Sequence, residues 1–249
     1  MKHLILLFAA SLLVASCSQP KDNTKNNANK QSTTFEVKYF GALKNMMHKG
    51  DISAKFDLAD LKETENLYAI GALENLKGEI QIFNSESFNT FVQDSTVTID
   101  NTFTKKATLL VYSIVESWDS YNIPDDIVTY EQLEKHIASV AKKNEINIEK
   151  PFPFLIEGKA LEFDWHVINW KDGDTEHSHE KHVNSGLNGT KNDQQVELLG
   201  FYSDSHHAVF THHTTNMHIH LKTGDGKLAG HVDALTLGKG MVLKLPGEK

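Results

Sequence analysis

The chain has 249 residues, of which 39% are hydrophobic and 23% are charged. Such a composition supports one large core or two modest ones, and it excludes collagen-like and wholly disordered chains. The formal net charge of -8 argues against a general nucleic-acid-binding protein, which needs a basic face. All 25 basic residues are lysines, so any mechanism that needs the planar, bidentate guanidinium of arginine is excluded.

The first residues are predicted to export the chain. Residues 1–16 have the pattern of a signal peptide, because Lys2 precedes an apolar run that is too short to span a bilayer. The small residues before Cys17 resemble the lipobox of bacterial lipoproteins, which implies cleavage before Cys17 and attachment of lipid to it. An ordinary secretory peptide with a chance cysteine is the alternative. We therefore expect an exported lipoprotein, anchored to a membrane through Cys17 on the periplasmic or cell-surface side.

The segment that follows is expected to be a tether. Residues 17–34 are rich in Asn, Lys, Ser, Thr and Gln, and they contain too little apolar surface to fold, which predicts disorder. Cys17 is the only cysteine of the chain, so an intramolecular disulfide is excluded.

Residues 35–150 are predicted to form an N-terminal α+β domain. The clearest helix covers residues 130–144, where Leu133, Ile137 and Val140 recur at helical spacing and Thr129 is a candidate N-cap. Alternating or continuous apolar runs predict strands at residues 35–40, 67–71, 78–83 and 107–115, and short helical segments are expected at residues 42–48 and 58–61.

Residues 151–249 are predicted to form a C-terminal β-rich metal-binding domain, with the boundary at the Pro151-Phe152-Pro153 break. Short apolar runs separated by turn residues predict six strands, at residues 154–156, 161–168, 196–202, 208–211, 217–221 and 232–237. The whole chain is therefore expected to be α+β, with two mixed or antiparallel sheets, a barrel-like C-terminal half and a few helices.

Histidines are concentrated in the C-terminal half. Eleven of the 14 fall between His166 and His231. His218 and His220 alternate with apolar residues, so on a strand both imidazoles point to one face. A hairpin turn at Gly224-Asp225-Gly226 can return the chain and bring His231 beside them. Three imidazoles with an open position are the ligands of a catalytic zinc-type site; the alternative is the polar face of an exposed strand.

Two further histidine groups remain ambiguous at this level. His177, His179 and His182 lie in a polar tract, which is typical of a solvated loop, although a second metal site or a lid is the alternative. The group His206, His207, His212 and His213 either contributes to the site or lies on a strand surface.

These segments resemble α-acetolactate decarboxylase. The resemblance is carried by Leu199-Gly200-Phe201, His218-Ile219-His220 and Gly230-His231-Val232, and in the N-terminal half by the segment from Ala69 to Ile80 with its Gly78-Glu79 pair. It extends over roughly residues 35–240. The eleven-residue spacing from His220 to His231 is that of the family.

The resemblance implies a metal-dependent decarboxylation. The family converts 2-hydroxy-2-methyl-3-oxobutanoate to acetoin and carbon dioxide, so a small 2-hydroxy-3-oxo acid is the expected substrate. It also implies a divalent metal, zinc above all, held by His218, His220 and His231, with Glu79 as the active-site carboxylate. Without the resemblance, Glu79 would be interpreted as an acidic residue in a turn after Gly78. A homodimer is compatible with this interpretation.

The chain departs from the family at the position of a substrate-binding arginine. The family has an arginine eight residues after the glycine that matches Gly158, and here that residue is His166. Alternation on the strand places Phe163 and Trp165 on the opposite face, so His166 is predicted to point into the metal cavity and partly to replace the missing cation. A nearby divalent ion should disfavour its protonation, which would make it a weak carboxylate partner.

Three functions therefore remain open. The first is a decarboxylase of acetolactate or a related acid, against which the export signal counts. The second is a divergent relative with other chemistry, such as metal-assisted hydrolysis or isomerisation, that uses His166 and Glu79. The third is a non-enzymatic, lipid-anchored metal-binding protein.

Overall fold

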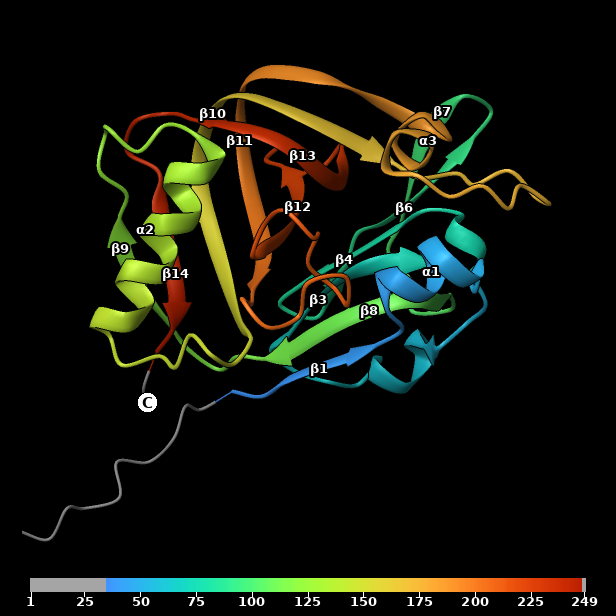
Figure 1. The fold of residues 1–249 in the computed structure, drawn as a ribbon. Helices are drawn as coiled ribbons and strands as arrows, with labels where there is room; N and C mark the ends of the chain where they lie inside the picture. The colour runs from blue at the N-terminus through green and yellow to red at the C-terminus, as the bar shows by residue number, and fades with distance from the viewer. Residues whose placement is uncertain (1–34, 248–249) are drawn as a thin grey trace, which may run out of the picture. The chain divides into compact units, whose positions relative to one another are not determined.

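The computed structural model describes residues 35–247, and their fold is shown in Figure 1. The predicted signal peptide, the lipid-bearing Cys17 and the predicted tether all lie outside these residues. Within them, no helix is long and apolar enough to cross a membrane.

The first sheet is built by the N-terminal half of the described chain. Its central strand β3 is a nearly continuous apolar run, and all seven of its residues are buried, as expected for a strand covered on both faces. The pairing is antiparallel throughout, in the order β1-β8-β3-β4-β6-β7, with β2 beside β8 and β5 beside β4. The strands are β1 (Val37–Phe40), β2 (Phe56–Asp57), β3 (Leu67–Leu73), β4 (Glu79–Phe83), β5 (Glu86–Ser87), β6 (Asn89–Gln93), β7 (Thr96–Asp100) and β8 (Lys106–Ile114).

The second sheet is also antiparallel and is partly closed into a ring. Strand β10 pairs with β11 along one edge and with β13 along the other, and β12 joins β11 to β13. Its strands are β9 (Trp118–Asn122), β10 (Phe152–Val167), β11 (Leu187–Tyr202), β12 (Met217–Thr223), β13 (Ala229–Leu237) and β14 (Val242–Pro246). This confirms the predicted α+β class with two antiparallel sheets. Strand β9 comes before the predicted domain boundary at residue 151, yet it pairs with β14, which comes after it. The boundary stays a prediction.

Few helices accompany the sheets in the described chain. They are α1 (Leu43–Lys49), α2 (Tyr130–Lys143) and α3 (His179–Asn184), with 3-10 turns at Leu58–Leu61 and Glu74–Leu76. The Thr129 hydroxyl accepts from the N–H of Gln132, whose side chain accepts from the N–H of Thr129, so a capping box starts α2. Helix and N-cap are therefore confirmed, although Ala141 rather than Val140 completes the fully buried stripe.

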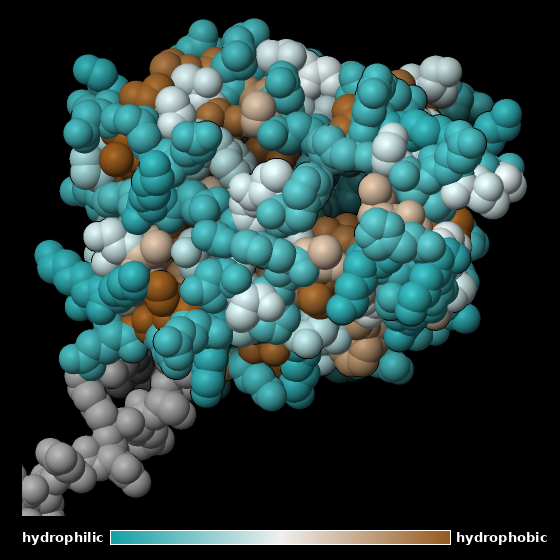
Figure 2. All heavy atoms as spheres, in the orientation of Figure 1, coloured by the Kyte–Doolittle hydropathy of each residue, from teal (hydrophilic) through white to brown (hydrophobic). Residues whose placement is uncertain are grey.

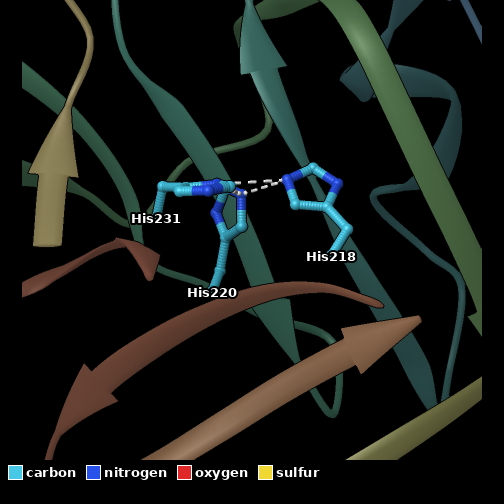
Figure 3. Close-up of side chains that lie close together, drawn as sticks. All are labelled: His218, His220 and His231. Carbon is cyan, nitrogen blue, oxygen red and sulfur yellow. Dashed lines mark hydrogen bonds between the residues drawn. The ribbon is translucent and has the colours of Figure 1, made fainter. Parts of the chain in front are cut away.

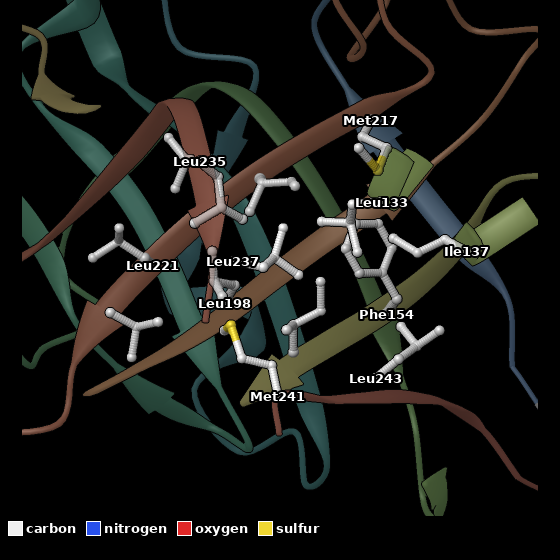
Figure 4. Packing of buried hydrophobic residues seen from close by; sticks show 14 of the residues in the cluster. Leu133, Ile137, Phe154, Leu198, Met217, Leu221, Leu235, Leu237, Met241 and Leu243 are labelled. Atoms are coloured by element: carbon white, nitrogen blue, oxygen red, sulfur yellow. The ribbon is translucent and has the colours of Figure 1, made fainter. Parts of the chain in front are cut away.

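Helix α2 packs on a core formed by the second sheet. Leu133 and Ile137 lie in one buried cluster with side chains from several strands, among them Phe154 and Leu243, as the close-up in Figure 4 shows. At Gly200, in β11, a Cβ atom would overlap the ring of Phe154, so only glycine lets this ring lie against the backbone. A second core cluster joins the two sheets, because it contains Ile70 and Val111 from the first and residues of the second, Leu155, Leu199 and Phe201.

Two segments differ from their predicted structure. Residues 208–211, predicted as a strand, form a loop whose carbonyls at Ala208 and Val209 accept from the first N–H groups of α1. The loop is thus shaped by the start of a distant helix rather than by a neighbouring strand. Residues 179–184, predicted as part of a loop, form α3, because the Ser178 side chain caps its N-terminus.

Candidate metal centre

Three histidines from β12 and β13 converge on one point. The Nε2 atoms of His218 and His220 are 3.1 Å apart, and Nδ1 of His231 lies 3.2 Å from the first and 3.4 Å from the second. His220 and His231 are directly opposite in the β12–β13 pair, while His218 lies two residues along β12 on the same face. Figure 3 shows the three rings turned toward one another. Their positions follow from strand alternation and the hairpin, as predicted.

The first sheet determines which nitrogen of His220 faces the others. The amide nitrogen of Gln81, in β4, donates to the Phe88 carbonyl at 2.6 Å and to Thr90 Oγ1 at 3.1 Å. This orients the amide, so its Oε1 accepts from Nδ1 of His220 at 2.9 Å. The proton of the imidazole is therefore on Nδ1, and Nε2 presents its lone pair to the cluster.

The donor set suits a divalent metal. Burial, and the charge of neighbouring histidines, lower the pKa of His218 to about 4 and those of His220 and His231 well below the ordinary value. Neutral imidazoles are the form that binds metal. Metal–nitrogen bonds of about 2.0–2.1 Å at tetrahedral angles separate the nitrogens by roughly 3.3 Å, close to the three distances observed. These three residues could therefore hold a metal ion.

Glu79 lies beside this cluster, at the start of β4. Its Oε2 is 4.0 Å from Nε2 of His220, and its Oε1 accepts from the N–H of Ile168 at 3.1 Å. Gly78 permits the close pairing of β4 with β6 at Glu79, because its φ is +146° and a Cβ there would collide with the Thr90 carbonyl. Burial raises the pKa of Glu79 to about 7, although the neighbouring charge of His166 and the Ile168 hydrogen bond oppose the rise.

His166 faces the same site from β10. Its ring centroid is 4.7 Å from that of His231, and its Nε2 is 3.7 Å from Oε1 of Glu79. Phe163 and Trp165 belong to the core of the second sheet, in line with the predicted alternation. At Gly230 a Cβ atom would press on the His166 carbonyl, so glycine there lets β13 approach β10 closely.

An aspartate completes this arrangement. Oδ2 of Asp233 accepts from Nδ1 of His166 at 2.7 Å, and its Oδ1 is 3.8 Å from Nε2 of His231. Burial lowers the pKa of His166. The Asp233 hydrogen bond and the charges of Glu79 and Asp233 together outweigh this effect, so the net shift of the pKa is upward. These carboxylates thus favour the protonated form of His166, which opposes the effect expected from a nearby metal ion.

The site opens into a cavity of about 1110 Å3. In Figure 2 the surface is hollowed between the region of α1 and α3 and the region of β12. Apolar side chains such as Met46, Leu76 and Phe210 form part of its wall. The rim carries Lys44 and Lys135, both exposed, and a second set of histidines, His177, His179, His182, His212 and His213.

The structure thus brings together all five site residues that the sequence singles out, and the role of each stays a prediction. It adds Gln81 and Asp233, which the sequence analysis missed. Both carry a detectable signal, because each lies two residues after a candidate site residue on a strand, Gln81 after Glu79 and Asp233 after His231. Two polar residues on one face of a buried apolar strand such as β4 indicate a polar site.

Several solved protein structures are similar to this chain. No protein-family model matches the chain, and no curated protein matches it. Among solved structures, α-acetolactate decarboxylase from Bacillus subtilis strain 168 has a TM-score of 0.66 at 14% identity, over 85% of this chain and 86% of that one. The enzyme from the subspecies spizizenii has a TM-score of 0.65 at 15% identity, over 85% and 86% of the two chains.

A third structure is a Staphylococcus aureus protein of unknown function described as similar to α-acetolactate decarboxylase. It has a TM-score of 0.64 at 15% identity, over 84% of each chain. Identities this low establish the fold alone, so the chain has the two-sheet fold seen in the α-acetolactate decarboxylases of Bacillus subtilis.

Proposed function

We propose that this protein is a metal-dependent decarboxylase that acts on acetolactate or a related 2-hydroxy-3-oxo acid. The observation that carries the proposal is the convergence of three neutral imidazoles beside a buried carboxyl group, on the fold that acetolactate decarboxylases have. His218, His220 and His231 would hold the divalent ion, which we propose to be zinc. When bound, such an ion supplies a Lewis acid for the substrate's carbonyl oxygen.

Glu79 is the candidate proton donor. Cleavage of the carbon–carbon bond releases carbon dioxide and leaves the electron pair on the former α-carbon, which then needs one proton. The Glu79 carboxyl lies beside His220 and lines the cavity, so it can deliver this proton to a substrate held at the cluster. The carboxylate that results is stabilised by the N–H of Ile168 and regains its proton from water.

His166 is the candidate partner of the substrate carboxylate. Asp233 accepts from Nδ1 and so keeps Nε2 directed toward Glu79 and the cavity. When protonated, His166 offers a single N–H at Nε2, whereas an arginine would offer two parallel donors. We therefore expect slow turnover of acetolactate. A related acid whose carboxylate needs only one hydrogen-bond donor would be the better substrate.

The test combines metal analysis with an activity assay. Purified protein should contain one tightly held divalent ion, and it should release acetoin from racemic acetolactate. Glu79→Gln should lose acetoin formation while it retains the ion, since the amide cannot donate a carboxyl proton. A His218→Ala/His220→Ala variant should contain no ion at this site. Retention of one full equivalent in that double variant would contradict the ligand assignment.

A divergent role is the second candidate, and the missing arginine favours it. If the natural protein binds its ion but yields no acetoin, the same residues suit metal-assisted hydrolysis or isomerisation, with Glu79 and His166 as proton carriers. A protein that binds several ions weakly and catalyses none of these reactions would instead be a metal-binding protein. In either case we propose that the chain is exported and anchored to a membrane through Cys17.

A further inference from the structure

The rim of the cavity carries a pair of facing imidazoles outside the candidate metal centre. Nδ1 of His177 lies 3.0 Å from Nε2 of His182, and both side chains line the cavity. The two rings are nearly perpendicular, at 82°, with their centroids 5.3 Å apart. Neither residue belongs to the cluster of His218, His220 and His231.

Surrounding groups hold this pair in place. The ring of His177 stacks on Trp170 at 4.4 Å, and that of His182 meets the same indole edge-on at 4.9 Å. The indole N–H donates to the Asp174 carbonyl, which ties the loop that carries His177 to Trp170. The Ser178 cap fixes the start of α3 and thus the position of His182. A preorganised pair loses little side-chain freedom when it binds a ligand.

Acidic side chains offset the positive charge of the lysine beside the pair. The Nζ of Lys181 forms an ion pair with Oδ1 of Asp174 at 2.8 Å and lies 3.7 Å from Oε2 of Glu176. Burial lowers the pKa of His177, and burial together with the charge of His177 lowers that of His182 to about 4. Both imidazoles are then neutral near pH 7, with a lone pair that a metal can use.

The separation of the two nitrogens also suits a metal. With metal–nitrogen bonds of about 2.0–2.1 Å, a 3.0 Å separation corresponds to an angle of about 95° at the ion. Imidazole nitrogen suits Ni²⁺ and Cu²⁺, and Cu²⁺ binds most tightly among the first-row divalent ions.

We propose that His177 and His182 form a second metal site at the rim of the cavity, which binds Ni²⁺ or Cu²⁺ through the two imidazoles with water as the other ligands. This site is separate from the inner cluster and does not depend on decarboxylase activity.

Trp170 makes the site measurable without any activity assay. The purified full chain is titrated with Cu²⁺ or Ni²⁺ alone, and bound metal and tryptophan emission are recorded together. Two equivalents should bind, and the emission of Trp170 should be quenched because its ring stacks on His177. Trp170→Phe should lose that quenching and still bind metal.

Paired variants separate the two sites. His177→Ala/His182→Ala should lose one equivalent and the quenching, whereas His218→Ala/His220→Ala should lose the other equivalent and keep the quenching. His207→Ala is the matched control, because His207 is exposed and bonds to Asn216 outside the cavity lining. Failure of the inner site alone would contradict the proposed function but leave this inference intact.

A milder substitution distinguishes metal binding from a purely structural hydrogen bond. His182→Gln can still bond to Nδ1 of His177 but offers no imidazole, so folding should persist while the second equivalent is lost. The inference is overturned if this variant or His177→Ala/His182→Ala keeps the second equivalent and the quenching. It is also overturned if the natural chain binds only the equivalent that His218→Ala/His220→Ala removes.

Discussion

Gln81 is a residue whose effect on the candidate metal centre is indirect. It touches no substrate, yet it determines the tautomer of His220 through one hydrogen bond, because its amide is oriented by the Phe88 carbonyl and Thr90. Partners of this kind orient a ligand and raise its basicity. We therefore expect the affinity of the centre to depend on a residue of the first sheet, although all three histidines come from the second.

Gln81→Leu should weaken metal binding by about 10–100-fold, since Nδ1 of His220 would lose its acceptor. Competition with a chromophoric chelator measures the affinity directly. Gln93→Leu is the control, because Gln93 is exposed at the end of β6 and should leave the affinity unchanged. Equal affinities in the natural chain and in Gln81→Leu would contradict the assigned role.

His166 is the residue at which this chain departs from acetolactate decarboxylases. His166→Arg should increase the rate of acetoin formation, because a guanidinium offers two parallel donors to a carboxylate and remains paired with Asp233. His166→Lys is the matched control, since it restores a charge without the planar fork and should help less. The claim that His166 slows the reaction is wrong if the natural protein already forms acetoin efficiently and His166→Arg is no faster.

At the scale of elements, the capping box of α2 is a local device with a tertiary consequence. The helix must begin at Tyr130 for Leu133, Ile137 and Ala141 to face the core of the second sheet. Further along, Glu134 accepts from Asn216 and Thr215, just before β12. The start of α2 and the strand that carries His218 and His220 are thus connected.

Thr129→Ala should lower the free energy of unfolding by about 1 kcal/mol, because it removes the acceptor for the Gln132 N–H. Urea unfolding followed by circular dichroism measures the change. Ser139→Ala, at an exposed position of the same helix, is the control and should change stability far less. An unchanged midpoint in Thr129→Ala would show that the cap contributes nothing to stability.

At the scale of the whole molecule, the site is assembled from both sheets. The first contributes Glu79 and Gln81 from one strand, and the second contributes His166, Asp233 and the three clustered histidines. The core cluster that joins the sheets holds these groups at fixed separations. Substitutions at this junction are therefore expected to act on the site as well as on stability.

The predicted lipid anchor at Cys17 would determine where the whole molecule is located. Cys17→Ser should release the protein from the membrane fraction or block its processing, because a serine cannot carry the thioether-linked lipid. Fractionation followed by immunodetection measures the distribution. Membrane association that is unchanged in Cys17→Ser would exclude the lipid anchor and leave the ordinary secretory peptide.

The sequence by itself was sufficient for the site strands and the main helix, whose positions depend on local periodicity. Strand alternation placed His218 and His220 on one face, the glycine-rich turn returned His231 to them, and helical spacing with a capping residue located α2. The two-sheet architecture also followed, because it rests on runs of apolar residues and on turns between them.

Only the tertiary structure determined which distant groups meet. Gln81 lies 139 positions from His220 in the chain, and Asp233 lies 67 from His166, so no local pattern predicts either hydrogen bond. An apolar run predicts a strand at residues 208–211, but these residues form a loop because their carbonyls bond to the start of α1, a contact that periodicity does not show. Burial is likewise a property of the assembled sheets, and it is the largest cause of the raised pKa of Glu79 and of the lowered pKa values of the three imidazoles.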